Sequence, residues 1–510
     1  MRPMASVRPV RYALVLALNV LCAGCVVGPD YRRPSLPSET QFTRSTQPDA
    51  GTGAQTAIRD TPAVIRQAWW TVFDSPALDA LIKRAFARNP DIASAQATLR
   101  EAQENVLAQR GAYFPSAELS YSPSRQKNAV GTLAPTLNSG QALYTLHTAQ
   151  LSIAYAPDVF GLNRRTVESL RAQVDAQRFQ LQAAYLTLAS NVVLAAIQQA
   201  SERAQIQAAH EVLRAEQQAL KMLQEQAALG EASGLDVAAQ QTALAQARQL
   251  LPPLEKQLEQ TRDLLAVLAG DPPARGGREN FDLSTLRLPA SLPRVLPSQL
   301  VDQRPDVRAA EAEVQSANAQ IGVAIANRLP QLSLSAQYGG SATRFSQLFA
   351  DKNTFWGLTG SLSQTLLDFG TLKHRQRAAE AAWQQSQAQY RSVVLSAFQN
   401  VADALYALQA DASALQAAND AETAAARTLD LTRKQQALGY VNALSVLNAE
   451  QAYQQSRMAQ IQARATQLGD TAALLQALGG SWAVAQPSRA SATGIAGRQP
   501  SDLAASAQKP

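Results

Sequence analysis

Two runs of 68 residues without a single glycine or proline dominate this chain of 510 residues. The first is Leu162–Leu229, and the second is Thr371–Leu438, which lies 209 residues further on. Each run follows a Phe-Gly pair and ends before a glycine, Gly230 in the first and Gly439 in the second. Because an α-helix rises about 1.5 Å per residue, each run predicts a helix on the order of 100 Å long. Globular helices average about 11–12 residues, so the runs predict an elongated molecule.

The repeat extends beyond these runs. Upstream, Asn89-Pro90-Asp91 matches Arg304-Pro305-Asp306 at an offset of 215, and downstream Gly270 matches Gly479 at an offset of 209. The offset changes between Pro115 and Gly161, in a stretch with the glycine and asparagine of a loop that tolerates insertion. The chain is therefore predicted to be internally duplicated. Each copy reads as short helix, strand, loop, strand, long helix, glycine turn and helix.

An apolar seam at helical spacing follows both runs and is typical of helices packed lengthwise as coiled coils. In each copy the long helix is expected to pair with two shorter helices, which in the first copy are residues 90–111 and 235–269. Pro252-Pro253 lies inside the second of these and is expected to bend or break it. The seam is formed by Val167, Val174, Leu181 and Leu188 with Leu170, Tyr185 and Val192 beside them, and in the second copy by Tyr390, Val394, Phe398, Val401, Leu405 and Leu408.

Four segments between the helices alternate apolar and polar residues, namely Ala117–Tyr121, Ala149–Tyr155, Leu332–Tyr338 and Trp356–Leu366. This period predicts strands with one apolar and one polar face. Strands of about ten residues with such faces can line a transmembrane β-barrel, although half-buried strands of soluble sheets look the same. Four strands are too few to close a barrel, and open edges cannot lie in lipid. If the strands span a membrane, several chains share one barrel, and three chains would give twelve strands.

The first 25 residues have the pattern of a bacterial lipoprotein signal. A basic start (Arg2, Arg8, Arg11) precedes a short apolar stretch, which ends in Ala23-Gly24-Cys25. Cys25 is predicted to become the acylated first residue, with a diacylglycerol thioether and an N-acyl chain. Val26 in the next position favours sorting to the outer membrane of a Gram-negative bacterium. The pattern departs from the usual one at Cys22, where leucine is common, and the alternative is ordinary secretion with Cys25 unmodified.

Charge and motif content argue against several classes of protein. The formal charge of +6 falls to +3 without the three signal arginines, and no basic stripe with interleaved aromatics predicts nucleic-acid binding. The histidines, His147, His210 and His374, are scattered over a strand and the two runs. No phosphate loop, metal-ligand spacing or nucleophile-base set is present in the sequence. We therefore expect no enzyme activity, no catalytic residue, no metal and no cofactor besides the lipid on Cys25.

An ordered set of motifs over nearly the whole mature chain resembles one known family. These motifs include Val26-Val27-Gly28-Pro29-Asp30-Tyr31, Trp69-Trp70-Thr71-Val72-Phe73, Leu251-Pro252-Pro253-Leu254-Glu255, and Arg304-Pro305-Asp306-Val307-Arg308-Ala309-Ala310-Glu311. The chain looks like a TolC-like outer membrane factor of the lipoprotein branch called the NodT family. The resemblance implies a mixed α and β membrane protein and a homotrimer. A 12-stranded outer membrane barrel would continue into a periplasmic α-helical barrel with an equatorial domain. It also implies the exit duct of a tripartite efflux pump, with a periplasmic adaptor and an inner-membrane transporter of the resistance-nodulation-division type.

The motifs and the repeat together predict a domain plan. Residues 1–24 are the signal peptide, 25–62 a lipidated linker, 63–89 and 271–303 equatorial segments, 90–270 the first repeat, 304–479 the second repeat, and 480–510 an equatorial end with a disordered tail. Within the repeats, strands are expected near 115–122, 141–157, 331–339 and 354–367, long helices over 162–229 and 371–438, and further helices over 235–269 and 442–478.

The turns after the two long helices are the mechanistic candidates, because the resemblance places the periplasmic mouth and the adaptor-docking surface there. Glycine fits a left-handed cap that turns each helix back. Ser445 and Asn448 stand where family members often carry acids, so an acidic gate ring is not predicted on the second turn. Asp236 has an alternative role as a cap of the following helix. The candidate residues are Leu229, Gly230, Glu231, Asp236, Leu438, Gly439, Tyr440, Asn442, Ser445 and Asn448.

Three functions remain open from the sequence. The first is a passive efflux duct for drugs or other small molecules, whose mouth we expect to open when the second-copy helix pair moves outward like an iris. The second is a duct for type I protein secretion, which the lipoprotein signal disfavours. The third is a lipid-anchored periplasmic coiled-coil tether without a channel, which requires that the four alternating segments are not barrel strands.

Overall fold

A computed structural model describes residues 27–34, 57–59, 68–127, 143–277, 279–288, 291–293 and 303–479. The chain divides into two compact units. The first, here called the sheet unit, comprises Met1–Glu39, Arg88–Tyr185 and Pro305–Gln399. The second, the hairpin unit, comprises Thr40–Ala87, Leu186–Arg304 and Asn400–Pro510. Each unit takes part of both sequence repeats, so the spatial division does not follow the duplication.

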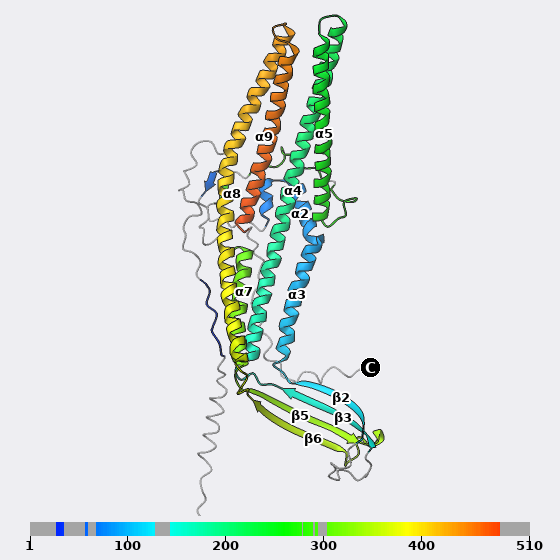
Figure 1. Cartoon of the computed structure of the whole chain (residues 1–510), viewed down its shortest axis with the longest axis vertical. Coiled ribbons are helices and arrows are strands. Elements are labelled where there is room, and N and C mark those ends of the chain that lie inside the picture. The colour runs from blue at the N-terminus through cyan, green and yellow to red at the C-terminus, as the bar shows by residue number, and fades with distance from the viewer. Residues whose placement is uncertain are drawn as a thin grey trace, which may run out of the picture. The chain divides into compact units, whose positions relative to one another are not determined.

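In addition to its strands, the sheet unit contains four helical segments, which stand at one end of the sheet (Figure 1). They are α3 (Pro90–Gly111), α7 (Pro305–Ala326) and the first parts of α4 (Leu162–Ala228) and α8 (Thr371–Ala437). Asn89 begins α3 by accepting a hydrogen bond from the Asp91 amide at 2.8 Å, and a proline in the first turn costs no helical hydrogen bond. Polar pairs hold α4 to its neighbours: Gln109 to Asn163 at 2.6 Å on the α3 side, and Ser169 to Ser316 at 2.9 Å on the α7 side.

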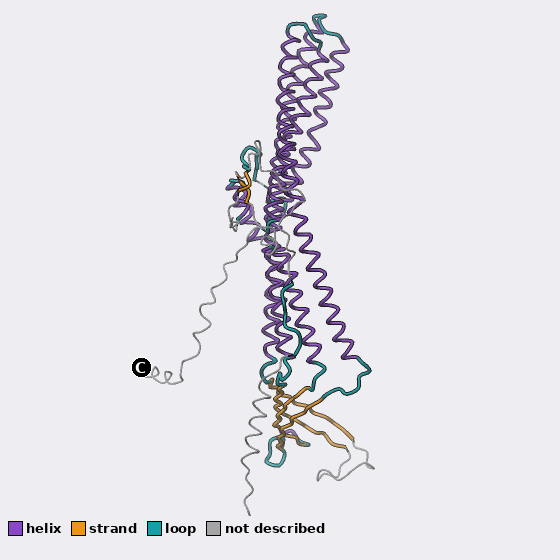
Figure 2. Tube along the Cα trace, turned by 90° about the vertical axis from the view of Figure 1, so that its left-hand side faces the viewer, coloured by secondary structure: helices purple, strands orange, loops and turns teal. Residues whose placement is uncertain are grey.

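Four antiparallel strands form one sheet in the order β2-β3-β5-β6. Figure 2 shows the strands leaving the helices through short loops. Their bounds are β2 (Ser116–Lys127), β3 (Leu143–Tyr155), β5 (Gln331–Ala342) and β6 (Thr354–Ser363). The four predicted strands are confirmed, and β2 continues five residues beyond its predicted end because Pro123 does not interrupt its pairing with β3. The loop around Asn138 lies outside the described residues.

The long helices begin where the glycine-free runs begin and end one residue before them. Every residue of the predicted seam is buried or half-buried, with Val167, Val192, Tyr390 and Val394 among the fully buried ones. The most apolar 18-residue stretch of α4 has a mean hydropathy of 1.3 and is long enough to cross a membrane by composition alone. Leu188, Val192 and Val193 of α4 are buried within the hairpin unit, which is the ordinary reason for such a stretch in a packed helix.

The hairpin unit pairs the remaining part of α4 with α5 (Gly234–Leu268) and that of α8 with α9 (Ala443–Ala477). Beside them are η1 (Trp69–Phe73), α2 (Pro76–Arg88) and a parallel pair of three-residue strands, β1 (Ala57–Arg59) and β4 (Ser291–Pro293). Gln199 of α4 fixes the segment after α5: its amide donates to the Glu279 carbonyl at 3.0 Å and accepts from the Phe281 amide at 3.0 Å.

Of the two outcomes predicted for Pro252-Pro253, a bend or a break, the break does not occur, since both prolines lie inside the continuous helix α5. Each proline removes one amide donor, which leaves the carbonyls of Arg248 and Gln249 without their usual helical partners. These two residues and both prolines are exposed. Water can therefore satisfy the freed carbonyls, and the helix continues.

Candidate functional site

The register of the sheet brings the apolar sides of all four strands onto one face. Leu119 pairs with Leu151, which pairs with Tyr338, which in turn pairs with Trp356. This face is open: Leu119 is 80% exposed and Trp356 74%. The opposite face is polar, and its hydroxyls bond to one another across strands, as in Ser333 to Ser361 at 2.6 Å and Thr148 to Ser341 at 3.2 Å.

Among the described residues, the two outer strands of the sheet, β2 and β6, each pair with one strand only. They are 12 and 10 residues long, which leaves two long rows of backbone donors and acceptors open to a further strand. A sheet with two open edges and one largely apolar face is incomplete as a single chain in water or in lipid.

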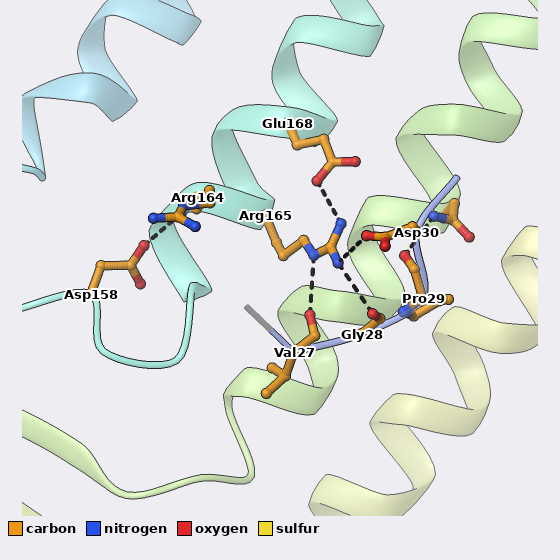
Figure 3. A network of polar contacts seen from close by, with 9 residues as sticks. Val27, Gly28, Pro29, Asp30, Asp158, Arg164, Arg165 and Glu168 are labelled. Atoms are coloured by element: carbon orange, nitrogen blue, oxygen red, sulfur yellow. Dashed lines mark hydrogen bonds and ion pairs between the residues drawn. The ribbon is translucent and has the colours of Figure 1, made fainter. Parts of the chain in front are cut away.

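A segment near the amino terminus, Val27–Pro34, is tied to the sheet unit by a buried arginine (Figure 3). We call this segment the amino-terminal clasp. Arg165 of α4 is 4% exposed and donates from Nε to the Val27 carbonyl and from Nη2 to the Gly28 carbonyl, each at 3.1 Å. Its remaining contacts are with carboxylates, Asp30 at 3.1 Å and Glu168 at 2.8 Å. Burial opposes the charged guanidinium, but these hydrogen bonds outweigh it and raise the pKa of Arg165.

Further polar contacts hold the clasp to α7. Asn318 donates to the Pro29 carbonyl at 3.0 Å, and Arg33 forms an ion pair with Glu311 at 2.9 Å. Gly28 has a φ of +101°, and a Cβ placed there would lie 2.5 Å from the Gly322 Cα. Only glycine fits this crossing of clasp and helix. Val27 is the second residue after Cys25, the predicted lipid site.

The two helical hairpins turn in the same way. Gly230 and Gly439 have φ of +78° and +79°, and the residue after each glycine donates to the carbonyl five positions earlier, Glu231 to Gln226 and Tyr440 to Gln435, each at 2.9 Å. This is the left-handed cap predicted for both turns. The helices that follow the two turns differ in the residues that cap them. The first has a serine cap with an acid three residues later, and the second has an asparagine cap with a serine three residues later.

In the first hairpin Ser233 caps α5, and the carboxylate of Asp236 three residues later accepts a hydrogen bond from the Ser233 amide at 3.2 Å. In the second hairpin Asn442 caps α9 by accepting from the Ser445 amide at 3.0 Å and the Ser445 hydroxyl at 2.8 Å. The capping alternative for Asp236 is thus observed. Large apolar side chains are also exposed at the tips, with Leu229 at 76%, Leu438 at 71% and Tyr440 at 78% exposure.

A polar cluster lies where the two hairpins meet inside the hairpin unit. Arg457 of α9 pairs with Glu211 of α4 at 2.7 Å, and Arg433 of α8 pairs with Glu450 of α9 at 2.7 Å. Gln240 of α5 donates to the carboxylate of Glu216 on α4. Except for Gln240, these residues line a pocket of about 270 Å³, whose wall also includes Tyr453 and Leu429.

Glu216 is the most buried charged group of this cluster, at 4% exposure. Burial first, and then the neighbouring Glu450 carboxylate, raise the pKa of Glu216 to about 7. A second carboxyl pair lies within the α8–α9 hairpin, where burial and Asp470 of α9 raise the pKa of Asp411 on α8 to about 6. Both pairs are suited to hold one proton between two carboxyl groups near neutral pH.

Comparison with known proteins decides the class of molecule. Residues 81–271 and 296–480 match the family described as Outer membrane efflux protein. The chain belongs to the outer membrane efflux protein family. The two matched stretches follow the internal duplication, and the membership places the chain in the outer membrane of a Gram-negative bacterium.

Relatives cover almost the whole molecule. The pyoverdine export outer membrane protein OpmQ of Pseudomonas putida is 31% identical over 452 residues, which are 88% of this chain and 95% of the relative. The cation efflux system protein CusC of Escherichia coli is 27% identical over 476 residues, 92% of this chain and 98% of the relative. Among solved structures, the outer-membrane channel OprN matches with a TM-score of 0.79 at 26% identity, over 90% of this chain and 100% of that chain. The chain is therefore an outer membrane efflux channel component of tripartite pumps, and its family is one of transport proteins rather than enzymes.

The predicted site residues lie in two groups, one at each hairpin tip. Within the tips the structure joins Ser233 to Asp236 and Asn442 to Ser445, whereas Glu231 and Asn448 are exposed. Among the described residues no hydrogen bond or ion pair joins one tip to the other. Cys25 lies outside the described residues.

Sequence reasoning missed both buried polar networks. Arg165 of the clasp and the inter-hairpin cluster of Glu211, Glu216, Gln240, Arg433, Glu450 and Arg457 were not singled out. One signal was available for the first network, since the clasp carries a family motif directly after the lipid-site cysteine. The second network gives no signal in the sequence, because its members are single polar residues scattered over four helices.

Proposed function

We propose that three copies of this chain close one 12-stranded barrel in the outer membrane and act as a passive exit duct. The observation that carries the proposal is the four-stranded sheet with one continuous apolar face and two open edges, β2 and β6. Pairing β2 of one copy with β6 of the next removes every edge, as lipid requires. The apolar face then meets lipid, and the polar hydroxyl face lines the lumen.

The hairpin unit is proposed to connect the duct to the other components of the pump. Its helices, with those of the two other copies, form the periplasmic tunnel, and its exposed tips receive a periplasmic adaptor that connects the duct to an inner-membrane transporter of the resistance-nodulation-division type. Drugs or other small molecules pass outward, and the transporter rather than the duct selects them. The second hairpin, α8–α9, moves outward to open the mouth.

The clasp begins two residues after Cys25, the proposed site of the lipid. A diacylglycerol thioether and an N-acyl chain on Cys25 enter the inner leaflet, and Val27, two residues after the modified cysteine, is held by Arg165. The clasp therefore sets the position of the lipid relative to α4 and α7, from which the strands depart.

Cysteine pairs across the open edges test the shared barrel. Ser120→Cys in β2 is combined in turn with Gly357→Cys, Thr359→Cys or Ser361→Cys in β6, so that one register brings the two thiols together. At that register oxidation should link copies into dimers and closed trimers on a non-reducing gel. The single variant Ser120→Cys should stay monomeric on the same gel. Monomer alone at every register, with both thiols shown to be reactive, would contradict the barrel.

Transport is tested in a host that lacks its own outer membrane duct and carries the cognate pump and adaptor. Expression of the chain should restore efflux of a fluorescent pump substrate. Asn442→Cys, chosen because the tip residue is exposed, should crosslink neighbouring copies on oxidation and stop efflux reversibly. Full efflux after verified crosslinking would contradict the outward movement of the second hairpin.

A further inference from the structure

Basic side chains replace apolar ones at the end of β2 that lies farthest from the helices. The residues of β2 that share a face with Leu119 and Tyr121 continue as Pro123, Arg125 and Lys127, because side chains two apart lie on one side of a strand. Both basic residues are exposed. On the face that meets lipid in the proposed barrel, apolar side chains thus give way to two cations.

An aromatic cluster marks the boundary between them. Tyr121 Oη lies 2.8 Å from His147 Nδ1, and the two rings are stacked with centroids 6.2 Å apart and planes 8° from parallel. Phe345 stands edge-on to both rings, at 5.8 Å from Tyr121 and 6.1 Å from His147. Aromatic side chains with a polar atom gather where hydrocarbon meets head groups. Tyr338 and Trp356 lie on the same face and extend this belt across β5 and β6.

Distance along the strand puts the cations at head-group depth. Arg125 and Lys127 are four and six residues beyond Tyr121, roughly 13 and 20 Å along an extended strand. A strand tilt of about 45° reduces these heights to roughly 9 and 14 Å above the belt. A cation at this level avoids the hydrocarbon and reaches the anionic groups of the lipid.

This end of the sheet has a net positive charge. Four cationic side chains, Arg125, Lys127, Arg344 and Lys352, stand against one carboxylate, Asp351, in residues 119–157 and 331–363. Residues 128–142, which connect β2 to β3, contain no charged side chain. Among the described residues neither Arg125 nor Lys127 forms an ion pair. Three copies would place a net charge of +9 around the outer rim.

We propose that Arg125 and Lys127, above the Tyr121–His147–Phe345 cluster, form a docking surface for the phosphorylated glycolipid of the outer leaflet, lipopolysaccharide. The two cations bind the phosphate groups of its lipid A portion, while the aromatic cluster and Leu119 contact the acyl chains. The proposal rests on the proposed barrel, because only a sheet that spans the membrane presents this face to the outer leaflet. Such basic clusters recognise lipid phosphates by charge.

The test titrates diphosphoryl lipid A into the detergent-solubilised, full-length protein and counts bound lipids by native mass spectrometry. The double variant Arg125→Gln/Lys127→Gln should bind at least about tenfold more weakly than the wild type. The matched control Arg214→Gln/Lys221→Gln removes the same charges from exposed positions of α4 and should bind like the wild type. Lipid A without phosphates should bind all three proteins weakly.

The same spectra separate this proposal from the barrel itself. Equal binding of diphosphoryl lipid A by a trimeric wild type and a trimeric double variant would overturn the docking surface and leave the barrel intact. Undiminished binding of the dephosphorylated lipid to the wild type would also overturn it. Absence of any three-copy species would overturn the proposed barrel and this surface with it.

Discussion

The α4–α5 and α8–α9 hairpins turn through glycines of nearly identical φ, and their following helices are both 35 residues long. Their side chains differ. The first tip has Glu231 and the Ser233–Asp236 cap, whereas the second has Tyr440 and the Asn442–Ser445 cap. The first has two prolines inside its returning helix, and the second has a carboxyl pair between its helices. The duplication therefore retains the backbone geometry and lets the chemistry of the two hairpins diverge.

The largest expected difference between the hairpins comes from Pro252 and Pro253, which have no counterpart in α9. Replacing both with alanine should restore two helical hydrogen bonds and raise the local opening free energy of α5 by about 3 kcal/mol. Hydrogen exchange of the amides around Arg248 should slow accordingly, while α9 exchanges as before. Unchanged exchange in α5 would mean that the wild-type helix already tolerates its missing donors without cost.

Lowering the pH should stabilise the second hairpin more than the first. Asp411 has a folded pKa of about 6 against an ordinary 3.8, so the folded hairpin binds more protons and its stability falls as pH rises from about 4 to above 6. Glu216, with a pKa of about 7 against 4.5, loosens the junction between hairpins over a somewhat higher range.

Exchange protection of α8 and α9 measured between pH 5 and pH 8, after correction for intrinsic rates, should decrease with pH. In the variant Asp411→Asn the decrease should be smaller, because the amide stays neutral. The same pH dependence in α5 as in α9 would break the comparison, since α5 has no such pair among the described residues.

The turn glycines should respond equally in both hairpins. A Cβ at Gly230 or at Gly439 meets no atom within 4 Å, so alanine at either site costs only the left-handed backbone strain, about 1–2 kcal/mol. Thermal unfolding should show the same loss for both variants. Gly234→Ala is the control, because that glycine is helical with open space around it and its replacement should not destabilise. A clearly unequal loss would show that the two turns are not equivalent.

The caps should give the smallest effects. Ser233→Ala and Asn442→Ala should each destabilise the first turn of the following helix by about 1 kcal/mol, measured as faster exchange of the Asp236 or the Ser445 amide. Exchanging the partners, with Asp236→Ser and Ser445→Asp in one chain, should retain both caps and transfer the acid from the first tip to the second. Loss of both caps in this exchanged variant would contradict their equivalence.

Much of this architecture could be predicted from residues that act locally. The absence of glycine and proline fixed the long helices to within one residue, and alternation at Leu119, Leu151, Tyr338 and Trp356 identified the apolar strand faces that the register then aligned. The helix does not break at Pro252 because solvent exposure, which a sequence does not display, lets water replace the lost donors. Arg165 and Glu216 could not be assigned partners, because their contacts join segments more than 100 and more than 200 residues apart.

The native mass of the detergent-extracted protein tests the shared barrel most directly. Native mass spectrometry of the mature, full-length chain should give three copies, each with the added mass of the diacylglycerol thioether and the N-acyl chain on Cys25. A species of one copy in mild detergent, with its sheet folded, would contradict the account, because β2 and β6 would then close no barrel.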